Sequence, residues 1–297
     1  MIQSHPCFLT PKTLKPDYPL FVFLPGMDGT GQLLRTQTEG LEAKFDVRCL
    51  AIPPDDLTNW DELAQQVVKL VKGELASDSR HNQNQRSVYL CGESFGGCLA
   101  LKVAVLAPEL FQRIILVNPA SSFNRRPWIA WGSQISRYLP EVAYQFSSVT
   151  FLPLLASFNR IAEADRDALI KAVRSVPQKT SIWRMSLLHK FQLPRQQLRQ
   201  LTQPVLIIAS ADDKLLPSLP EAYRLKRAFQ NADVVVLSES GHSCLLESEV
   251  NLYDMMKTHG FLDEDLNTET NSAAANGLGD RGLAAKNLLG LTQTSEV

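Results

Sequence analysis

Short apolar runs alternate with longer amphipathic segments through the first part of the chain. LFVFL at 20–24 is typical of a buried strand, and it stops at Pro25-Gly26. Between 59 and 75 the apolar positions recur at helical spacing. Further strands are predicted at 45–52, 87–91 and 113–117, and a further helix at 96–106. Strands that alternate with helices indicate βαβ units and a mostly parallel sheet, so we predict an α/β fold.

The middle of the chain has a different pattern. From 120 to 201 no convincing buried strand is present, and we interpret this part as a helical cap inserted over the end of the sheet. Its helical segments are expected at 128–137, 164–175 and 181–191. The alternation then resumes with strands at 204–209 and 233–237 and helices at 218–229 and 247–258.

The composition changes near the end of the sequence. Residues 267–297 contain no aromatic side chain and are rich in Asn, Thr, Ser, Ala and Gly, so they have little to bury. We predict one α/β domain over 1–265, with its cap at about 120–201, and a flexible C-terminal tail over 266–297.

Charge and cysteine content narrow the function classes. The 30 Lys and Arg against 31 Asp and Glu give a net charge of −1, without the basic excess of a nucleic-acid-binding protein. The five Cys form no disulfide framework, which favours a reducing compartment. We see no secretory signal and no apolar run of about 18 residues. We therefore predict a cytoplasmic protein without a transmembrane segment or a nucleic-acid partner, and leave peripheral membrane contact and oligomeric state open.

The strongest local motif is GESFGG at 92–97, which contains G-x-S-x-G between an expected strand and an expected helix. A nucleophile elbow requires this context, because the tight strand-to-helix turn lifts the serine hydroxyl above the sheet. We predict that Ser94 is a catalytic nucleophile. The alternative is a glycine-rich turn in which Ser94 only caps the following helix.

A serine hydroxyl is a poor nucleophile at neutral pH and needs a base beside it. Of the five His, only His242 follows a late strand in a loop, SESGHS at 238–243, and we predict that it is the base. His81 and His259 fit surface positions better, and His189 lies within a helical pattern.

The acid that orients the base is expected after the strand at 204–209, where Asp212 and Asp213 compete. Acid loops of this kind place the carboxylate four residues before a proline, and DKLLP at 213–217 has this spacing. We therefore favour Asp213 and keep Asp212 as the alternative. The alternative for either residue is a structural role, in which the aspartate only accepts hydrogen bonds from backbone N–H groups of a turn.

Acyl transfer also needs backbone N–H donors that stabilise the negative charge on the carbonyl oxygen. The amide of Phe95 is one candidate, because it follows the nucleophile. The second is expected in the loop PGMDGTG at 25–31, where we favour the amide of Met27, with Asp28 close by. This loop has neither a P-loop nor a dinucleotide fingerprint, so we do not expect nucleotide binding.

The cysteines allow a competing interpretation of the same region. Cys91, Cys98 and Cys244 lie close in sequence to Ser94 or His242, but small packed apolar side chains explain them equally well. The spacings C-x-x-C and H-E-x-x-H are absent. We predict no metal and no cofactor.

Five segments together resemble the α/β-hydrolase superfamily: FLPGMDGTG at 23–31, GESFGGCL at 92–99, NPASSF at 118–123, DKLLPS at 213–218 and Gly241-His242. Within it they look like the hydrolase half of the esterase, lipase and thioesterase group that includes plant phytyl ester synthases. The resemblance implies a nucleophile at Ser94, an acid at Asp213 and a base at His242.

The chain also departs from the pattern of these families. Pro25-Gly26 stands where many members have His-Gly. The plant proteins carry a second, acyltransferase-type half with an H-x-x-x-x-D motif, and none of the five His here has Asp five positions later. The resemblance therefore implies acyl-ester chemistry at a serine rather than the synthase activity as such.

These observations predict a serine hydrolase that acts on a small-molecule ester or thioester. The apolar side chains of the cap, with Trp128 and Trp131 as weak candidates for substrate binding, suggest a long acyl or isoprenoid group. Cap core is the alternative role for these residues. Two rival functions are an acyltransferase that uses a lipophilic alcohol and a non-enzymatic protein with the hydrolase fold.

Overall fold

The structure is a computed structural model, and it describes residues 5–78, 86–125 and 152–263. The chain divides into two compact units, which adjoin in sequence between Tyr253 and Asp254. The predicted tail over 266–297 lies outside the described residues, as do Trp128 and Trp131.

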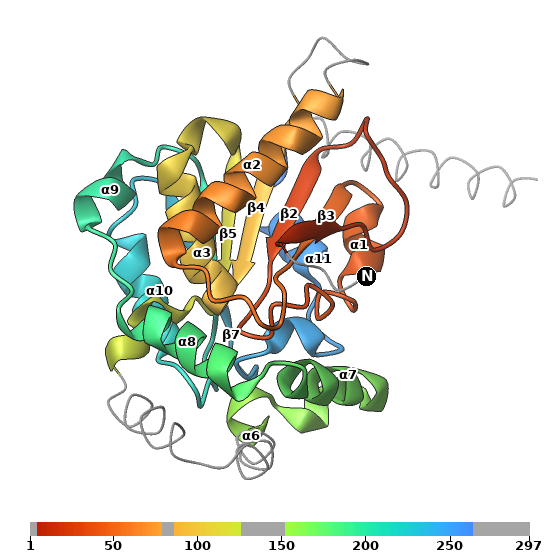
Figure 1. Cartoon of the computed structure of the whole chain (residues 1–297), viewed down its shortest axis with the longest axis vertical. Helices are drawn as coiled ribbons and strands as arrows, with labels where there is room; N and C mark the ends of the chain where they lie inside the picture. The colour runs from red at the N-terminus through yellow and green to blue at the C-terminus, as the bar shows by residue number, and fades with distance from the viewer. Residues whose placement is uncertain (1–4, 79–85, 126–151, 264–297) are drawn as a thin grey trace, which may run out of the picture. The chain divides into compact units, whose positions relative to one another are not determined.

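Seven strands of the described chain form one sheet in the order β1-β3-β2-β4-β5-β6-β7 (Figure 1). Each strand pairs in parallel with its neighbours except β1, which runs antiparallel to β3. The strands are β1 (Cys7–Leu9), β2 (Leu20–Leu24), β3 (Asp46–Ala51), β4 (Val88–Glu93), β5 (Arg113–Val117), β6 (Val205–Ser210) and β7 (Ala232–Leu237). The mostly parallel α/β fold that the sequence predicts is confirmed.

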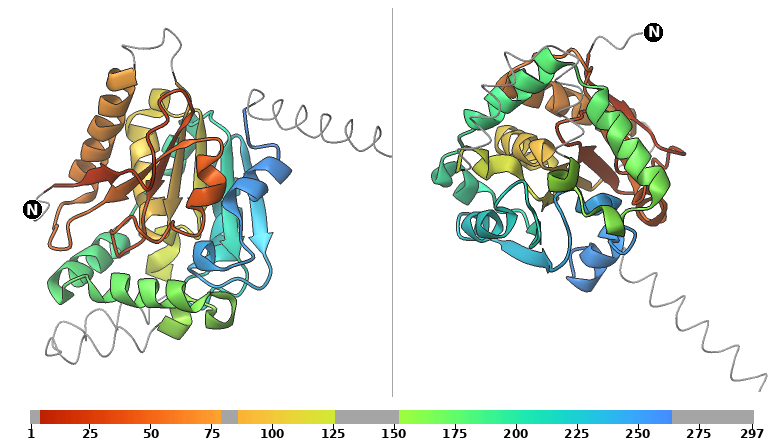
Figure 2. Two further views of the ribbon diagram at one scale, coloured as in Figure 1. Left: turned by 90° about the vertical axis from the view of Figure 1, so that its right-hand side faces the viewer. Right: turned by 90° about the horizontal axis from the view of Figure 1, so that it is seen from below.

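Helices cover both faces of this sheet. Figure 2 shows α2 on one face and α1 on the other. The α-helices are α1 (Thr38–Glu42), α2 (Trp60–Asp78), α3 (Phe95–Leu106), α6 (Leu152–Leu155), α7 (Glu163–Arg174), α8 (Gln178–His189), α9 (Arg195–Gln200), α10 (Ser218–Lys226) and α11 (Leu252–Thr258). Short 3-10 helices are η1 (Pro108–Leu110), η2 (Ala120–Arg125), η3 (Phe158–Arg160) and η4 (Cys244–Leu246).

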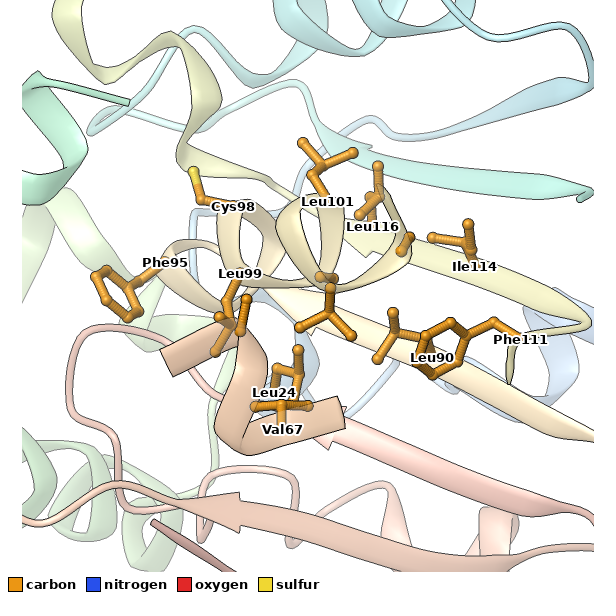
Figure 3. Packing of buried hydrophobic residues seen from close by; sticks show 14 of the residues in the cluster. Leu24, Val67, Leu90, Phe95, Cys98, Leu99, Leu101, Phe111, Ile114 and Leu116 are labelled. Carbon is orange, nitrogen blue, oxygen red and sulfur yellow. The ribbon is translucent and has the colours of Figure 1, made fainter. Parts of the chain in front are cut away.

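The central strands are apolar at nearly every position because both of their faces are covered. Each residue of β2 and β4 is buried. Alternate side chains point to opposite faces, so Leu24, Leu90 and Leu116 meet the side chains of α3. Figure 3 shows this packing, and Val67 of α2 belongs to the same cluster as Leu24 and Leu99. The sheet thereby holds the ends of β2, β4, β5 and β6 in fixed positions.

Between 152 and 200 the chain forms the helices α6 to α9, and α7 and α8 lie across the carboxyl ends of the strands (Figures 1 and 2). Its contacts with the sheet domain are specific. The indole N–H of Trp60, on α2, donates to the carbonyl of Leu187 on α8 at 2.9 Å. The indole of Trp60 also stacks on Phe95, with 4.5 Å between ring centroids. The described part of the predicted cap is therefore mostly helical, and the helix expected at 128–137 lies outside the described residues.

Several elements differ from the prediction, and α1, α6 and α9 were not expected as separate helices. The last helix was expected from 247 but begins at Leu252, because Glu247 is extended and forms an isolated bridge with Ile161. The edge strand β1 was not predicted, since its three half-buried residues are too few to produce a periodic signal.

The close approach of α3 to β2 leaves no room for a side chain at Gly96. A Cβ built there would lie 2.0 Å from the carbonyl oxygen of Leu24, whereas a Cβ at Gly73 of α2 would meet nothing within 4 Å. We expect Gly96→Ala to lower the free energy of unfolding by at least about 2 kcal/mol. Gly73→Ala, the control, should raise it by roughly 0.5–1 kcal/mol. Urea unfolding measures both, and two equal changes would contradict this packing.

Candidate active site

Ser94 lies between the last residue of β4 and the first residue of α3. Its φ of 53° and ψ of −111° are unusual for a residue with a side chain. Two hydrogen bonds hold this conformation: the Ser94 N–H donates to the carbonyl of Val117 at 2.9 Å, and the Ala120 N–H donates to the carbonyl of Ser94 at 3.0 Å. The ends of β4 and β5 therefore fix the turn that presents the Ser94 hydroxyl.

His242 connects Ser94 to Asp213. Its Nε2 lies 2.8 Å from Ser94 Oγ, and its Nδ1 lies 2.7 Å from Asp213 Oδ2. The three residues come from positions far apart in the sequence, and the loops after β4, β6 and β7 bring them together. An imidazole bonded in this way can accept a proton from the hydroxyl on one side while the carboxylate orients it from the other. Asp212, the alternative acid, is half exposed and forms an ion pair with Lys214 instead.

The Asp213 carboxylate is held in one orientation by several donors. The N–H groups of Leu215 and Leu216 each donate to Oδ1 at 2.9 Å, and the Ser218 hydroxyl donates to Oδ2. Burial raises the pKa of Asp213, but its interaction with His242 and these hydrogen bonds outweigh burial and hold the pKa below its ordinary value. The side chain is therefore an ionised acceptor for the imidazole.

Two buried polar side chains hold the loop of His242. The Asn118 side-chain amide donates to the His242 carbonyl at 2.7 Å and to the Ser210 hydroxyl at 2.9 Å. The Glu247 carboxylate accepts the Gly241 N–H at 2.8 Å and the Arg160 Nε–H at 2.7 Å. In the sequence, Asn118 stands out only as part of the motif NPASSF and Glu247 has no evident role, because most of their partners are backbone atoms of other segments.

Glu93 places a second carboxyl group close to the imidazole. It precedes Ser94 and is 7% exposed. Burial raises the pKa of Glu93 to about 7, while the charge of His242 lowers it. Burial also lowers the pKa of His242, but Asp213 and then Glu93 raise it, and the result lies above the ordinary 6.5.

The two expected backbone donors belong to Phe95, which follows Ser94, and to Met27 in the loop after β2. Phe95 is the first residue of α3, so its N–H has no acceptor within that helix. Met27 lies in a turn in which the Gly29 N–H donates to the Gly26 carbonyl at 3.0 Å. A Cβ built on Gly26 would be 3.9 Å from the Ser94 Cβ, so this turn borders the serine.

All five cysteines are free thiols, and four of them are buried. Burial raises the pKa of the Cys91 and Cys98 thiols well above the ordinary value, which makes them poor nucleophiles. Among the described residues, no group of three His, Cys, Asp or Glu side chains is arranged to hold a metal ion. Across the same ranges, no helix combines the length and the apolar character needed to cross a membrane.

A family model described as the alpha/beta hydrolase fold matches residues 80–249. The chain belongs to the alpha/beta hydrolase family. Solved structures agree with this assignment: a hydrolase from Oleispira antarctica superposes with a TM-score of 0.68 at 13% identity, covering 86% of this chain and 93% of that one. An identity this low shows the fold alone.

Relatives within the alpha/beta hydrolase family include ester-forming and ester-cleaving enzymes. Phytyl ester synthase 1, chloroplastic, of Arabidopsis thaliana is 33% identical over 267 residues, which are 82% of this chain and 37% of that protein. The chain thus spans little more than a third of this relative's length. A pimeloyl-[acyl-carrier protein] methyl ester esterase of Nitrosomonas europaea is 27% identical over 179 residues, 56% of this chain and 70% of that protein. The resemblance to the group of phytyl ester synthases is confirmed.

The carboxyl groups around His242 predict how its imidazole titrates. Because Asp213 and Glu93 both raise its pKa, the midpoint should lie above pH 6.5, and Glu93→Gln should move it to lower pH. NMR titration of the imidazole signals measures this midpoint. Glu62→Gln, in the first turn of α2, is the control and should leave it unchanged. An unchanged or higher midpoint in Glu93→Gln would contradict this account of the site.

Proposed function

We propose that this protein is a serine hydrolase that cleaves carboxylic esters or thioesters through an acyl-serine intermediate. The observation that carries the proposal is the continuous hydrogen-bonded chain from Ser94 Oγ through His242 to Asp213. A hydroxyl bonded to a buried imidazole, which is in turn bonded to an ionised carboxylate, is the arrangement that activates a serine. Esterase relatives of the family support the same class of reaction.

In the proposed reaction, Ser94 Oγ forms a bond to the carbonyl carbon of the substrate while His242 Nε2 takes the hydroxyl proton. The N–H groups of Met27 and Phe95 stabilise the oxyanion that forms. As the intermediate collapses, the bond to the leaving alcohol or thiol breaks and His242 gives it the proton. Water then attacks acyl-Ser94 by the same steps, and the carboxylic acid leaves with Ser94 restored.

Asp213 supports both halves of this cycle without exchanging a proton. Its carboxylate keeps the hydrogen on His242 Nδ1, so that Nε2 faces Ser94 as the acceptor. It also stabilises the imidazolium that exists after the first proton transfer. A lowered pKa suits this role, because the carboxylate then stays charged across the working pH range.

We further propose a long acyl or isoprenoid group in the substrate. The apolar composition of the cap and the name of the phytyl ester synthase relative support this class. Trp128 and Trp131, which are weak candidates for substrate binding with cap core as their alternative role, lie outside the described residues. The proposal rests on composition and on the relative.

Acyl transfer to a lipophilic alcohol is the second candidate. The observation that favours it is the 33% identity to phytyl ester synthase 1. The same acyl-serine intermediate serves both reactions, and the acceptor decides between them. Incubation with an acyl ester and a long-chain alcohol, followed by mass spectrometry of products, separates them: free acid as the main product supports hydrolysis, and a new ester supports transfer.

Removal of the nucleophile should abolish activity. Ser94→Ala should prevent covalent labelling by a fluorophosphonate probe, and it should lower turnover of a short p-nitrophenyl ester by roughly 10³-fold or more. His242→Ala should have a similar effect. Ser175→Ala, an exposed cap residue, is the control and should label like the parent. A Ser94→Ala variant that kept most of the activity would exclude the proposed mechanism.

The two neighbouring aspartates should differ sharply. Asp213→Asn removes the carboxylate that orients the imidazole, so kcat should fall by about 10²-fold to 10⁴-fold. Asp212→Asn changes a side chain that pairs only with Lys214 in the described structure and should cost less than about tenfold. Steady-state kinetics on one ester gives both numbers. The reverse ranking would assign the acid to Asp212.

A further inference from the structure

One side chain of α8 reaches the loop that carries Met27. Arg184 is 2% exposed, and its Nη1 donates to the carbonyl oxygen of Met27 at 2.7 Å. Its Nη2 donates to the carbonyl oxygen of Pro53 at 3.1 Å. Met27 follows β2 and Pro53 follows β3, and these strands are parallel neighbours. A single guanidinium of the cap therefore joins two loops at the carboxyl edge of the sheet.

The two loops are shaped and charged to receive this guanidinium. Gly29 has a φ of +70°, and a Cβ built on it would lie 2.7 Å from Arg184 Nη1, so only glycine leaves space for the cation. Burial lowers the pKa of Arg184, and the carboxylates of Asp28 and Asp56 act in the opposite direction. A guanidinium stays charged under such conditions. The hydrogen bonds to Met27 and Pro53 are therefore charge-assisted.

The bond to Met27 fixes the peptide planes around the expected oxyanion donor. In a trans peptide the C=O and N–H groups point in opposite directions. The turn bond from Gly29 N–H orients the Gly26 carbonyl, and with it the Met27 N–H on the same plane. Arg184 orients the next plane through the Met27 carbonyl. The two peptide planes are related only by φ and ψ of Met27. When hydrogen bonds hold both planes, the Met27 N–H can point in only one direction.

We infer that Arg184 is a positioning residue for the oxyanion hole, through which the cap fixes the direction of the Met27 N–H. The inference rests on the proposed function, since an oxyanion forms only if Ser94 attacks a carbonyl. It adds that a side chain of the cap affects the chemical step through the backbone of Met27. Its effect should fall on kcat, because misdirecting the N–H donor weakens stabilisation of the transition state more than it weakens substrate binding.

The experiment compares Arg184→Met and Arg184→Lys in the full chain with a matched control. Arg166 is also a cap arginine that donates to a backbone carbonyl, but its acceptor, Ile161, belongs to the cap itself. The substrates are a short p-nitrophenyl ester and its thionoester, in which sulfur replaces the carbonyl oxygen. Sulfur is a weaker acceptor on a longer bond, so a well-directed N–H strongly favours the oxygen substrate.

We expect Arg184→Met to lower kcat for the ester by roughly 10²-fold, with KM within about threefold of the parent. The ratio of ester rate to thionoester rate should fall by about tenfold, a change that general loss of structure would not cause. Arg184→Lys should recover part of the loss, because an ammonium can replace one of the two donors. Arg166→Met should keep the parent ratio.

Two results would overturn the inference. One is an Arg184→Met variant with the kcat and rate ratio of the parent, and the other is an equal loss on both substrates. If Arg184→Met does not fold, Arg184→Lys provides the test. An Arg184→Lys variant with a melting temperature near that of the parent and an unchanged ratio of ester rate to thionoester rate overturns the inference. Fluorophosphonate labelling of the parent separates the two claims, because an unlabelled parent refutes the proposed function, whereas a labelled one leaves only the role of Arg184 at issue.

Discussion

The side-chain amide of Asn118 is the interaction on which the geometry of the site depends. It donates to the carbonyl of His242, a residue 124 positions later, and its oxygen accepts the Ser210 N–H at 2.8 Å. The backbone of Asn118 adopts a φ of 42°, and its N–H donates to the carbonyl of Ile208. One fully buried residue thus ties the end of β5 to the end of β6 and to the loop after β7. The unusual backbone conformation of Asn118 persists because hydrogen bonds to several segments hold the residue in place.

The fold and the reacting groups can be predicted because their signals lie in short, continuous stretches of sequence. A buried parallel strand is a continuous apolar run, and a strand-to-helix turn around a serine is a motif of six adjacent residues. The sequence therefore predicts β2, β4, β5 and β6 to within two residues at each end. The spacing to Pro217 favours Asp213, and the structure places that carboxylate against His242. The catalytic roles themselves stay predictions.

What the sequence does not predict are contacts between a side chain and the backbone of a distant segment. Asn118, Glu247 and Arg184 each bind a carbonyl or an N–H more than five residues away, and a backbone acceptor has the same chemistry whichever residue carries it. No pattern in the composition marks such a partner. The start of α11 was misplaced for this reason, since Glu247 is extended where its carboxylate binds Gly241 and Arg160.

The burial of the thiols gives this chain a set of internal reporters. Cys49 lies on β3, Cys98 lies on α3 behind Ser94, and Cys244 follows His242, and none of them exceeds 1% exposure. A thiol reagent reaches such a group only when its surroundings open, so the rate of alkylation measures the free energy of that opening. Each site reports on a different element: the sheet, the elbow helix or the histidine loop. Mass spectrometry of alkylated peptides would therefore map which part of the hydrolase opens first, without any introduced label.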